Sequence, residues 1–216
     1  MNYFKNALFT IAALVVFSNT NAQTFGRILK NTPFVFGLSE HIVIDNGKEY
    51  QFKFDTKNWQ LMPFPSKISA EAYLKKGWSL GTEFAYTSYK ANKIVDNVAL
   101  LKDHTFFASD FNIRYHFNIL FKAPSFFDPY LMAGMGFTYR SGVNAGQTSS
   151  GTNNVGVGCN FWIYKGFGLN LQSVGKFAMK GGSKYGEKSN YLHHSVGLVY
   201  KLKPLSGKPA VIEKSI

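Results

Sequence analysis

The sequence predicts an all-β fold, an up-and-down barrel of eight antiparallel strands. Three observations favour it. Apolar and polar residues alternate with a period of two along most of the chain, which is typical of strands with two different faces. The 216 residues include 21 Phe, 12 Tyr, 3 Trp and 20 Gly, a composition that suits strands bordered by aromatic residues. Short and long connections between the alternating runs follow one another in turn, as they do in a meandering sheet.

The first residues of the chain have the layout of a secretory signal. A short polar start, Met1–Lys5, precedes the apolar run Ala7–Phe17, and small polar residues follow at Ser18–Ala22. This run is shorter than the roughly 20 residues that a membrane-spanning helix needs, which disfavours a retained membrane anchor. We therefore expect residues 1–22 to be a signal peptide, residues 23–203 to form the barrel and residues 204–216 to be a short periplasmic tail.

The alternation is clearest in two neighbouring runs. In Asn154–Ile163 the odd-numbered residues are apolar, and the even-numbered ones are Asn, Gly or Trp. Only Tyr164 and Lys165 separate this run from Gly166–Met179, so the two runs predict a tight hairpin. The same pattern predicts eight strands in all, at Pro33–Ile44, Ile68–Leu74, Trp78–Tyr86, Phe106–Phe117, Tyr130–Tyr139, Asn154–Ile163, Gly166–Met179 and Leu192–Leu202.

The connections between these strands alternate in length. Those at Lys75–Gly77 and Tyr164–Lys165 are short, whereas Asn118–Asp128 is longer than a turn requires. The long loops lie at Asp45–Lys67, Tyr89–His104, Arg140–Asn153 and Lys180–Asn190. Strands of about ten residues, with turns on one side and long loops on the other, are typical of a transmembrane barrel. Closing such a sheet leaves no edge strand whose backbone groups lack partners in lipid.

The face opposite the apolar one carries ionisable side chains. A soluble lipocalin-like barrel would turn the apolar face inward, but the other face is rich in glycine and suits a polar filling better than a solvent-facing coat. Glu71, Glu83, Asp110 and Arg114 fall on it and form the predicted interior ionic network. We expect Arg114 to bridge Glu83 or Asp110, because an unpaired buried charge is very unfavourable. This network predicts a plugged barrel, with a gated ion path as the alternative.

Aromatic residues near the predicted strand ends suit the belts that fix the height of a barrel in a membrane. The predicted belt consists of Trp78, Tyr115, Phe117, Tyr139, Tyr164 and Tyr200. Trp162 also lies near a strand end, although counting along its strand places it on the inward face.

The formal net charge of +12 comes from lysines spread through turns, loops and the tail, with no basic run. This dispersal, together with export, disfavours nucleic acid as a partner and is compatible with anionic lipid headgroups or lipopolysaccharide. The sequence shows no metal-ligand spacing and no phosphate-binding glycine loop, so neither a metal nor another cofactor is expected.

The chain resembles the small outer-membrane β-barrel proteins related to the OmpA transmembrane domain and OmpX, within the porin-like barrels. The similarity covers roughly Pro33 to Leu202 and includes the segments DPYLMAGMGFTYR and HHSVGLVYKLK. It implies a monomeric barrel in the outer membrane of a Gram-negative bacterium, in contact with lipids and lipopolysaccharide. An envelope or surface protein could bind the long loops, above all Asp45–Lys67. Because only a short tail follows the last strand, we do not expect the peptidoglycan-binding domain that often follows OmpA-related barrels.

The one arrangement that resembles catalytic machinery is His193 with Ser195. Outer-membrane barrels that deacylate lipid A use a His-x-Ser arrangement, and these two residues have that spacing. Both should face inward, away from acyl chains, and no acidic residue can be assigned to orient the histidine. We therefore expect no catalytic residues and a non-enzymatic barrel that anchors its outer loops. A narrow porin-like channel is the alternative, and a lipid A-modifying enzyme is a weaker one.

Overall fold

The computed structural model describes residues 32–45, 59–95, 98–121, 126–141, 148–179 and 190–202. The predicted signal peptide, residues 1–22, and the predicted tail, residues 204–216, lie outside these residues. Within the described part of the chain, no helix is both long and apolar enough to cross a membrane.

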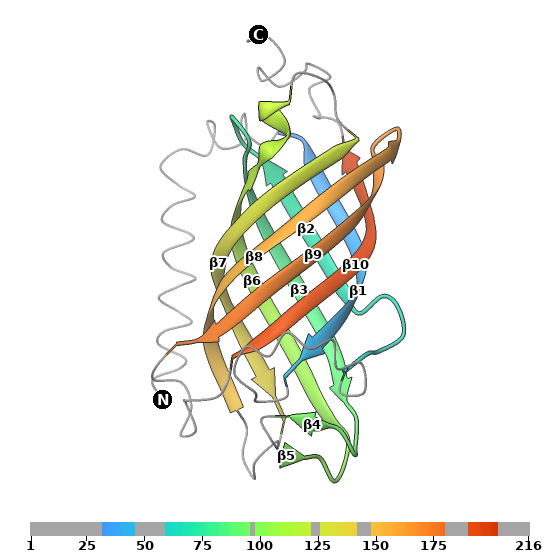
Figure 1. Cartoon of the computed structure of the whole chain (residues 1–216), viewed down its shortest axis with the longest axis vertical. Helices are drawn as coiled ribbons and strands as arrows, with labels where there is room; N and C mark the ends of the chain where they lie inside the picture. Colours follow the sequence, from blue (N-terminus) through green and yellow to red (C-terminus); the bar gives the residue numbers. More distant parts are fainter. Residues whose placement is uncertain are drawn as a thin grey trace, which may run out of the picture. The chain divides into compact units, whose positions relative to one another are not determined.

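Eight antiparallel strands close into a barrel (Figure 1) in the order β1-β10-β9-β8-β7-β6-β3-β2. The strands are β1 (Phe34–Ile44), β2 (Lys67–Tyr73), β3 (Trp78–Tyr89), β6 (His104–His116), β7 (Phe127–Arg140), β8 (Thr148–Tyr164), β9 (Phe167–Ala178) and β10 (Tyr191–Leu202). The first and last strands pair from Phe34↔Leu202 to Ile44↔Leu192, so the barrel has no open edge. The predicted eight-stranded up-and-down barrel is confirmed.

The connections gather at two ends of the barrel. At the turn end lie the β2–β3 turn, the β8–β9 turn and the β6–β7 connection, which contains the 3-10 helix η2 (Phe117–Leu120). Each turn uses a residue followed by glycine, both with positive φ: Lys76 and Gly77 in one, Lys165 and Gly166 in the other. These left-handed positions reverse the chain tightly between twisted strands. The longer connections form the loop end, where β4 (Ile94–Val95) and β5 (Val98–Ala99) make a small hairpin.

Several strands reach further toward the loop end than the sequence predicts, most of all β8 and β3. Strand β8 begins at Thr148, opposite Arg140, so half of the predicted loop Arg140–Asn153 is strand. Strand β3 continues to Tyr89. In the added part of β8, Thr148–Asn153, both faces are polar or small, so the alternation that marks the rest of the strand is lost there.

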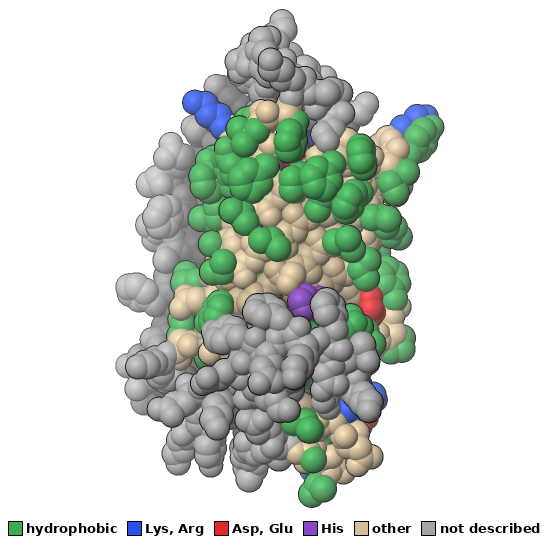
Figure 2. Space-filling view, viewed as in Figure 1, with side chains coloured by type: hydrophobic (Ala, Val, Ile, Leu, Met, Phe, Trp, Pro, Cys, Tyr) green, Lys and Arg blue, Asp and Glu red, His purple; other side chains and the backbone are tan. Residues whose placement is uncertain are grey.

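The apolar face of the strands points outward. Phe111, Met135 and Val155 are 55%, 61% and 59% exposed, and Figure 2 shows hydrophobic side chains covering much of one wall. The alternate residues are buried and mostly polar, as at Asn112 and Thr152. This arrangement overturns the lipocalin-like alternative, because a soluble carrier would bury the apolar face and expose the polar one.

Candidate functional site: the charged barrel interior

Arg114 is the centre of the interior network. From β6 its guanidinium reaches Glu71 on β2, with Nη1 2.5 Å from Oε2, and Glu83 on β3 through Nη2. All three side chains are buried. The expected contact of Arg114 with Glu83 is present. Asp110 lies on the same strand as Arg114 but pairs with a different cation.

Two buried lysines complete the pairing, and the sequence analysis missed both. The Nζ of Lys67 lies 2.9 Å from Glu83 Oε2 and donates to Ser195 Oγ at 3.1 Å. Lys176 on β9 pairs with Asp110, which also accepts a hydrogen bond from Asn154 Nδ2 at 2.9 Å. The sequence predicts Lys67 to be the last residue of a loop, outside the strands. Lys176 could have been found, because the period of two places it on the same face as other polar residues of its strand.

His116 links the network to the turn end. Its Nε2 lies 2.6 Å from Glu71 Oε1 and its Nδ1 lies 2.9 Å from Asp128 Oδ1. An imidazole with a carboxylate at each nitrogen can donate to both only in its protonated, cationic form. Asp128 also accepts hydrogen bonds from the Tyr73 hydroxyl at 2.9 Å and from Trp162 Nε1 at 3.2 Å, so Trp162 serves the interior network.

The charges of this network balance among the described residues. Four carboxylates face four cationic groups: Glu71, Glu83, Asp110 and Asp128 against Lys67, Arg114, Lys176 and His116. Each buried charge has an opposite charge within hydrogen-bonding distance, which is the condition for keeping ions in a space with little water. The network therefore joins strands across the lumen.

Inward-facing glycines make room for side chains of the interior. A Cβ on Gly136 would lie 1.9 Å from Asp110 Oδ1, and one on Gly158 would lie 2.3 Å from the Tyr130 ring. Tyr130 donates to Gln172 Oε1 at 2.9 Å and lies under Arg114, with 5.0 Å between the guanidinium carbon and the ring centroid. Glycines on the polar face thus allow the narrow interior to be filled without a clash.

An apolar cluster of buried side chains lies toward the loop end of the barrel. We call it the apolar cap; it consists of Val43, Ala85, Tyr89, Val95, Leu100, Phe106, Ala108 and Tyr191. Val95 and Leu100 belong to the β4–β5 hairpin region, which therefore packs against the strands. At the border of the cap, Asp45 accepts from the Tyr89 hydroxyl at 2.9 Å and pairs with Arg140 at 3.1 Å.

The structure places His193 and Ser195 inward, as predicted. Ser195 Oγ accepts from Lys67, whereas neither ring nitrogen of His193 has a hydrogen-bond partner within the described residues. His193 instead packs edge-on against His41, with ring centroids 4.7 Å apart. No group of three or more potential metal ligands occurs in the part of the chain that the structure describes. The His193–Ser195 hydrogen bond that a catalytic pair would use is not formed.

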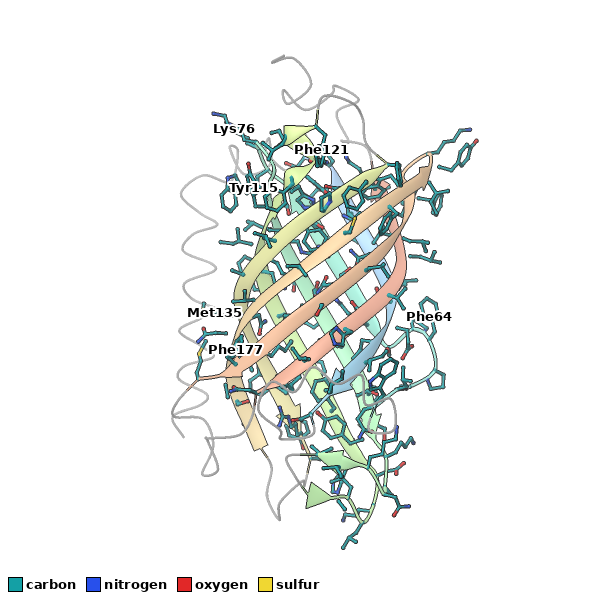
Figure 3. All side chains as sticks on the ribbon, in the orientation of Figure 1. Phe64, Lys76, Tyr115, Phe121, Met135 and Phe177 are labelled. Atoms are coloured by element: carbon teal, nitrogen blue, oxygen red, sulfur yellow. The ribbon has the colours of Figure 1, made fainter. Side chains whose placement is uncertain are left out.

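Most of the predicted aromatic belt lies at the turn end. Trp78 packs on Tyr115 with ring centroids 5.0 Å apart, and Tyr115 packs on Phe117 at 5.3 Å. Tyr164 is the last residue of β8, and Tyr200 lies close to the end of β10, so both lie at the turn end. Tyr139, in contrast, lies toward the loop end of β7. Figure 3 shows Tyr115, Phe121 and Lys76 together near the turn end, and Phe64 beside the barrel wall, well away from them.

Comparisons with known proteins identify the class of this fold. No family model matches the chain, and no curated protein matches it. Among solved structures the chain is similar to the N-terminal β-barrel domain of Pseudomonas aeruginosa OprF, with a TM-score of 0.51, 13% identity, and 80% of this chain and 98% of that chain covered. It is similar to Neisserial surface protein A, with a TM-score of 0.52, 14% identity, and 80% and 97% covered.

A third similar structure is the outer membrane protein OprG of Pseudomonas aeruginosa, with a TM-score of 0.50, 12% identity, and 80% and 96% covered. At such identities the similarity concerns the fold alone. The resemblance to small outer-membrane β-barrels that the sequence predicts is confirmed at that level. The chain has the fold of a transmembrane barrel.

Proposed function

We propose that this protein is a non-enzymatic barrel of the outer membrane whose closed interior anchors and positions its outer loops. The apolar outer wall suits lipid, and the aromatic residues of the turn end suit a membrane interface. In this proposal the turn end faces the periplasm, the loop end faces the outside of a Gram-negative cell, and the barrel is monomeric.

The observation that carries the proposal is that two sets of buried side chains occupy the barrel interior. The ionic network joins β2, β3, β6, β7 and β9 by salt bridges, and the apolar cap fills the loop-end side. An ion crossing the barrel would have to break paired charges and then enter an apolar cluster, and both steps are unfavourable. A barrel of eight strands is just wide enough to be filled by its own side chains.

The loop end offers surface for a partner. Leu101 is 96% exposed next to the buried Leu100, and Leu61, Phe64 and Ile94 are also exposed large apolar residues of the connections. Exposed apolar side chains that gather in loops suit contact with another protein. Residues 46–58, which make up much of the predicted binding loop Asp45–Lys67, lie outside the described residues.

Single-channel recording tests the closed lumen. The refolded protein, with its folding checked by a heat-modifiable gel shift, is added to a planar bilayer beside a variant that lacks residues 91–102. Both should insert without steady current, because the ionic network closes the lumen even when the hairpin is removed. Reproducible current steps from the wild type would overturn the proposal and favour the narrow channel. Current from the deletion variant alone would show that the apolar cap, and not the ionic network, blocks the passage of ions.

The enzyme alternative has a separate readout. A barrel that modifies lipid A through His193 and Ser195 would change the mass of lipid A in cells that express it, and Ser195→Ala would abolish the change. We expect identical lipid A masses with the wild type, with the variant and without the protein.

A further inference from the structure

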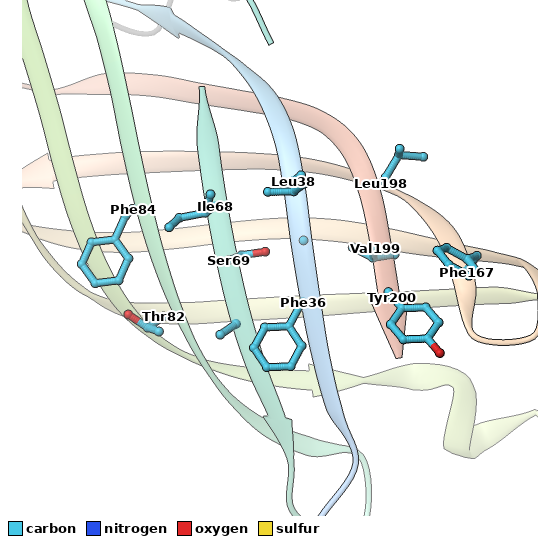
Figure 4. A pocket seen from close by; sticks show the side chains of 12 residues that line it. Phe36, Leu38, Ile68, Ser69, Thr82, Phe84, Phe167, Leu198, Val199 and Tyr200 are labelled. Carbon is cyan, nitrogen blue, oxygen red and sulfur yellow. The ribbon is translucent and has the colours of Figure 1, made fainter. Parts of the chain in front are cut away.

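A groove of about 640 Å³ crosses the outer wall of the barrel, over β3, β2, β1 and β10 (Figure 4). One side of it is a row of directly opposed residues, Phe84, Ile68, Leu38 and Leu198. The other side is the next outward row, Thr82, Ala70, Phe36, Tyr200 and Phe167. Between the rows the backbone of residues such as Gly37 forms the floor.

The dimensions of the groove fit one hydrocarbon chain. The two rows are two residues apart along each strand, which corresponds to about 6.8 Å. This is close to the room that a single methylene chain needs when it contacts carbon atoms at about 3.5–4 Å on both sides. The small side chains of Ala70 and Thr82 widen the groove opposite Ile68 and Phe84.

The direction of the groove gives it two different ends. At one end, Thr82 and Phe84 lie in the middle of β3, well away from its turn. At the other end, Phe167 is the first residue of β9 and packs on Tyr200 with ring centroids 4.4 Å apart. The turn just before Phe167 carries Lys165, whose Nζ lies 4.9 Å from the Tyr164 ring centroid. The groove therefore runs from the middle of the apolar wall to the turn end, where Lys165 lies among aromatic residues.

We propose that this groove seats one acyl chain of an anionic glycerophospholipid in the leaflet on the turn side. The chain would lie with its methyl end toward Phe84 and its headgroup phosphate near Lys165. An apolar groove that ends beside a cation and tyrosines at the interface complements a lipid, which is apolar along its chain and charged at its head. The apolar wall of a second copy of the barrel would offer no negative charge to pair with Lys165, so a lipid is the better occupant.

Native mass spectrometry tests this assignment. The barrel is reconstituted in vesicles of equimolar phosphatidylglycerol and phosphatidylcholine and then released in detergent. The mass of each complex identifies the lipid that stays bound. Ala70→Phe fills the widest part of the groove. Ala133→Phe is the matched control, because Ala133 is an outward alanine on β7, outside the groove. Lys165→Asn removes the charge and keeps a residue that tolerates the positive φ of 43° at this turn position.

The wild type and Ala133→Phe should retain one phosphatidylglycerol, and Ala70→Phe should reduce retention by about tenfold or more. Lys165→Asn should still retain a lipid but lose the preference for phosphatidylglycerol. Equal retention by the two alanine variants, or no headgroup preference in the wild type, would overturn the proposal. A lipid-free dimer would assign the groove to a second copy, and displacement of phospholipid by added lipid A would assign it to that lipid.

The inference rests on the proposed membrane location but not on the closed lumen. The gel shift and vesicle insertion are therefore measured on the same samples. A folded barrel that fails to insert would contradict the membrane location, whereas an inserted barrel without bound lipid would contradict the groove assignment alone.

Discussion

The two parts of the barrel interior are filled by different kinds of side-chain contact. Toward the turn end, Arg114 and its partners hold opposite charges at hydrogen-bonding distance. Toward the loop end, Phe106, Tyr89 and Tyr191 pack as an apolar cluster, with ring centroids 5.4 and 5.7 Å from Phe106. Each residue of the network needs particular partners, whereas the cap needs mainly volume and shape.

The ionic network and the apolar cap also differ in the elements that supply their residues. All members of the network come from strands, whose register fixes each side chain against its neighbours. The cap includes Val95 and Leu100, which come from a connection that packs onto the strands. A loss in the network should therefore weaken the whole barrel, and a loss in the cap should weaken mainly the hairpin.

The largest effect is expected from Arg114→Leu. This change leaves Glu71 and Glu83 buried without their shared cation and should lower the free energy of unfolding by about 3–5 kcal/mol. Urea unfolding in vesicles, followed by tryptophan fluorescence and the gel shift, measures it. The matched control is Lys90→Met, which breaks the half-exposed 2.8 Å pair with Asp103 and should leave the midpoint unchanged. Equal midpoints for the two variants would refute a network that holds the barrel together.

A smaller and more local effect is expected from Leu100→Ala. Leu100 is 3% exposed in the cap, and its neighbour Leu101 is 96% exposed, so Leu101→Ala is a control one residue away. Loss of a buried leucine side chain costs about 2–5 kcal/mol when the whole structure depends on it, and less when only a segment is released. Trypsin should cut the Leu100→Ala barrel at Lys93 or Lys102 sooner than the control. Equal cleavage rates would mean that the cap does not hold the hairpin.

The smallest effect is expected from His193→Phe, at the border between the two regions. Because its ring nitrogens have no hydrogen-bond partner among the described residues, replacing them with carbon removes no bond, and the change should alter stability by less than about 1 kcal/mol. Ser195→Ala, which removes the acceptor of Lys67, is the comparison and should cost about 1 kcal/mol. A loss of several kcal/mol on His193→Phe would show that the ring holds buried water or another polar group.

The exposed Lys90–Asp103 pair gives the loop end a modest dependence on pH. The hydrogen bonds from the Lys90 side chain and the Ala91 backbone lower the pKa of Asp103 below its usual value. A group with a lowered pKa stabilises the folded form above its ordinary pKa, and this contribution is lost as the pH falls through the lowered value.

The residues of the ionic network show which interior contacts can be predicted from the sequence and which cannot. The period of two was enough to place Glu71, Glu83, Asp110 and Arg114 on one shared face, because a strand sends successive side chains to opposite sides. It could not choose the partner of Asp110, since Lys176 lies on β9, across the lumen from β6. Sequence spacing gives positions along one strand but no distances across a closed barrel.

The loop end was the harder part to predict. The extension of β8 through Thr148–Asn153 lacks the apolar alternation of the rest of the strand, so the sequence predicts a loop there. Val95 and Leu100 are apolar residues within a connection, and nothing in their spacing indicates that they join a buried cluster with Phe106 and Tyr89. Their burial depends on how the hairpin packs, which is a tertiary property.

The sequence by itself determined the number of strands, the two faces of each strand and the alternation of turns and loops, because these follow from local backbone geometry and side-chain polarity. The tertiary structure alone decided which face is inside, which carboxylate meets which cation, and how the cap and the outer groove form. These features depend on closure of the sheet, which brings residues far apart in the chain to fixed distances from one another.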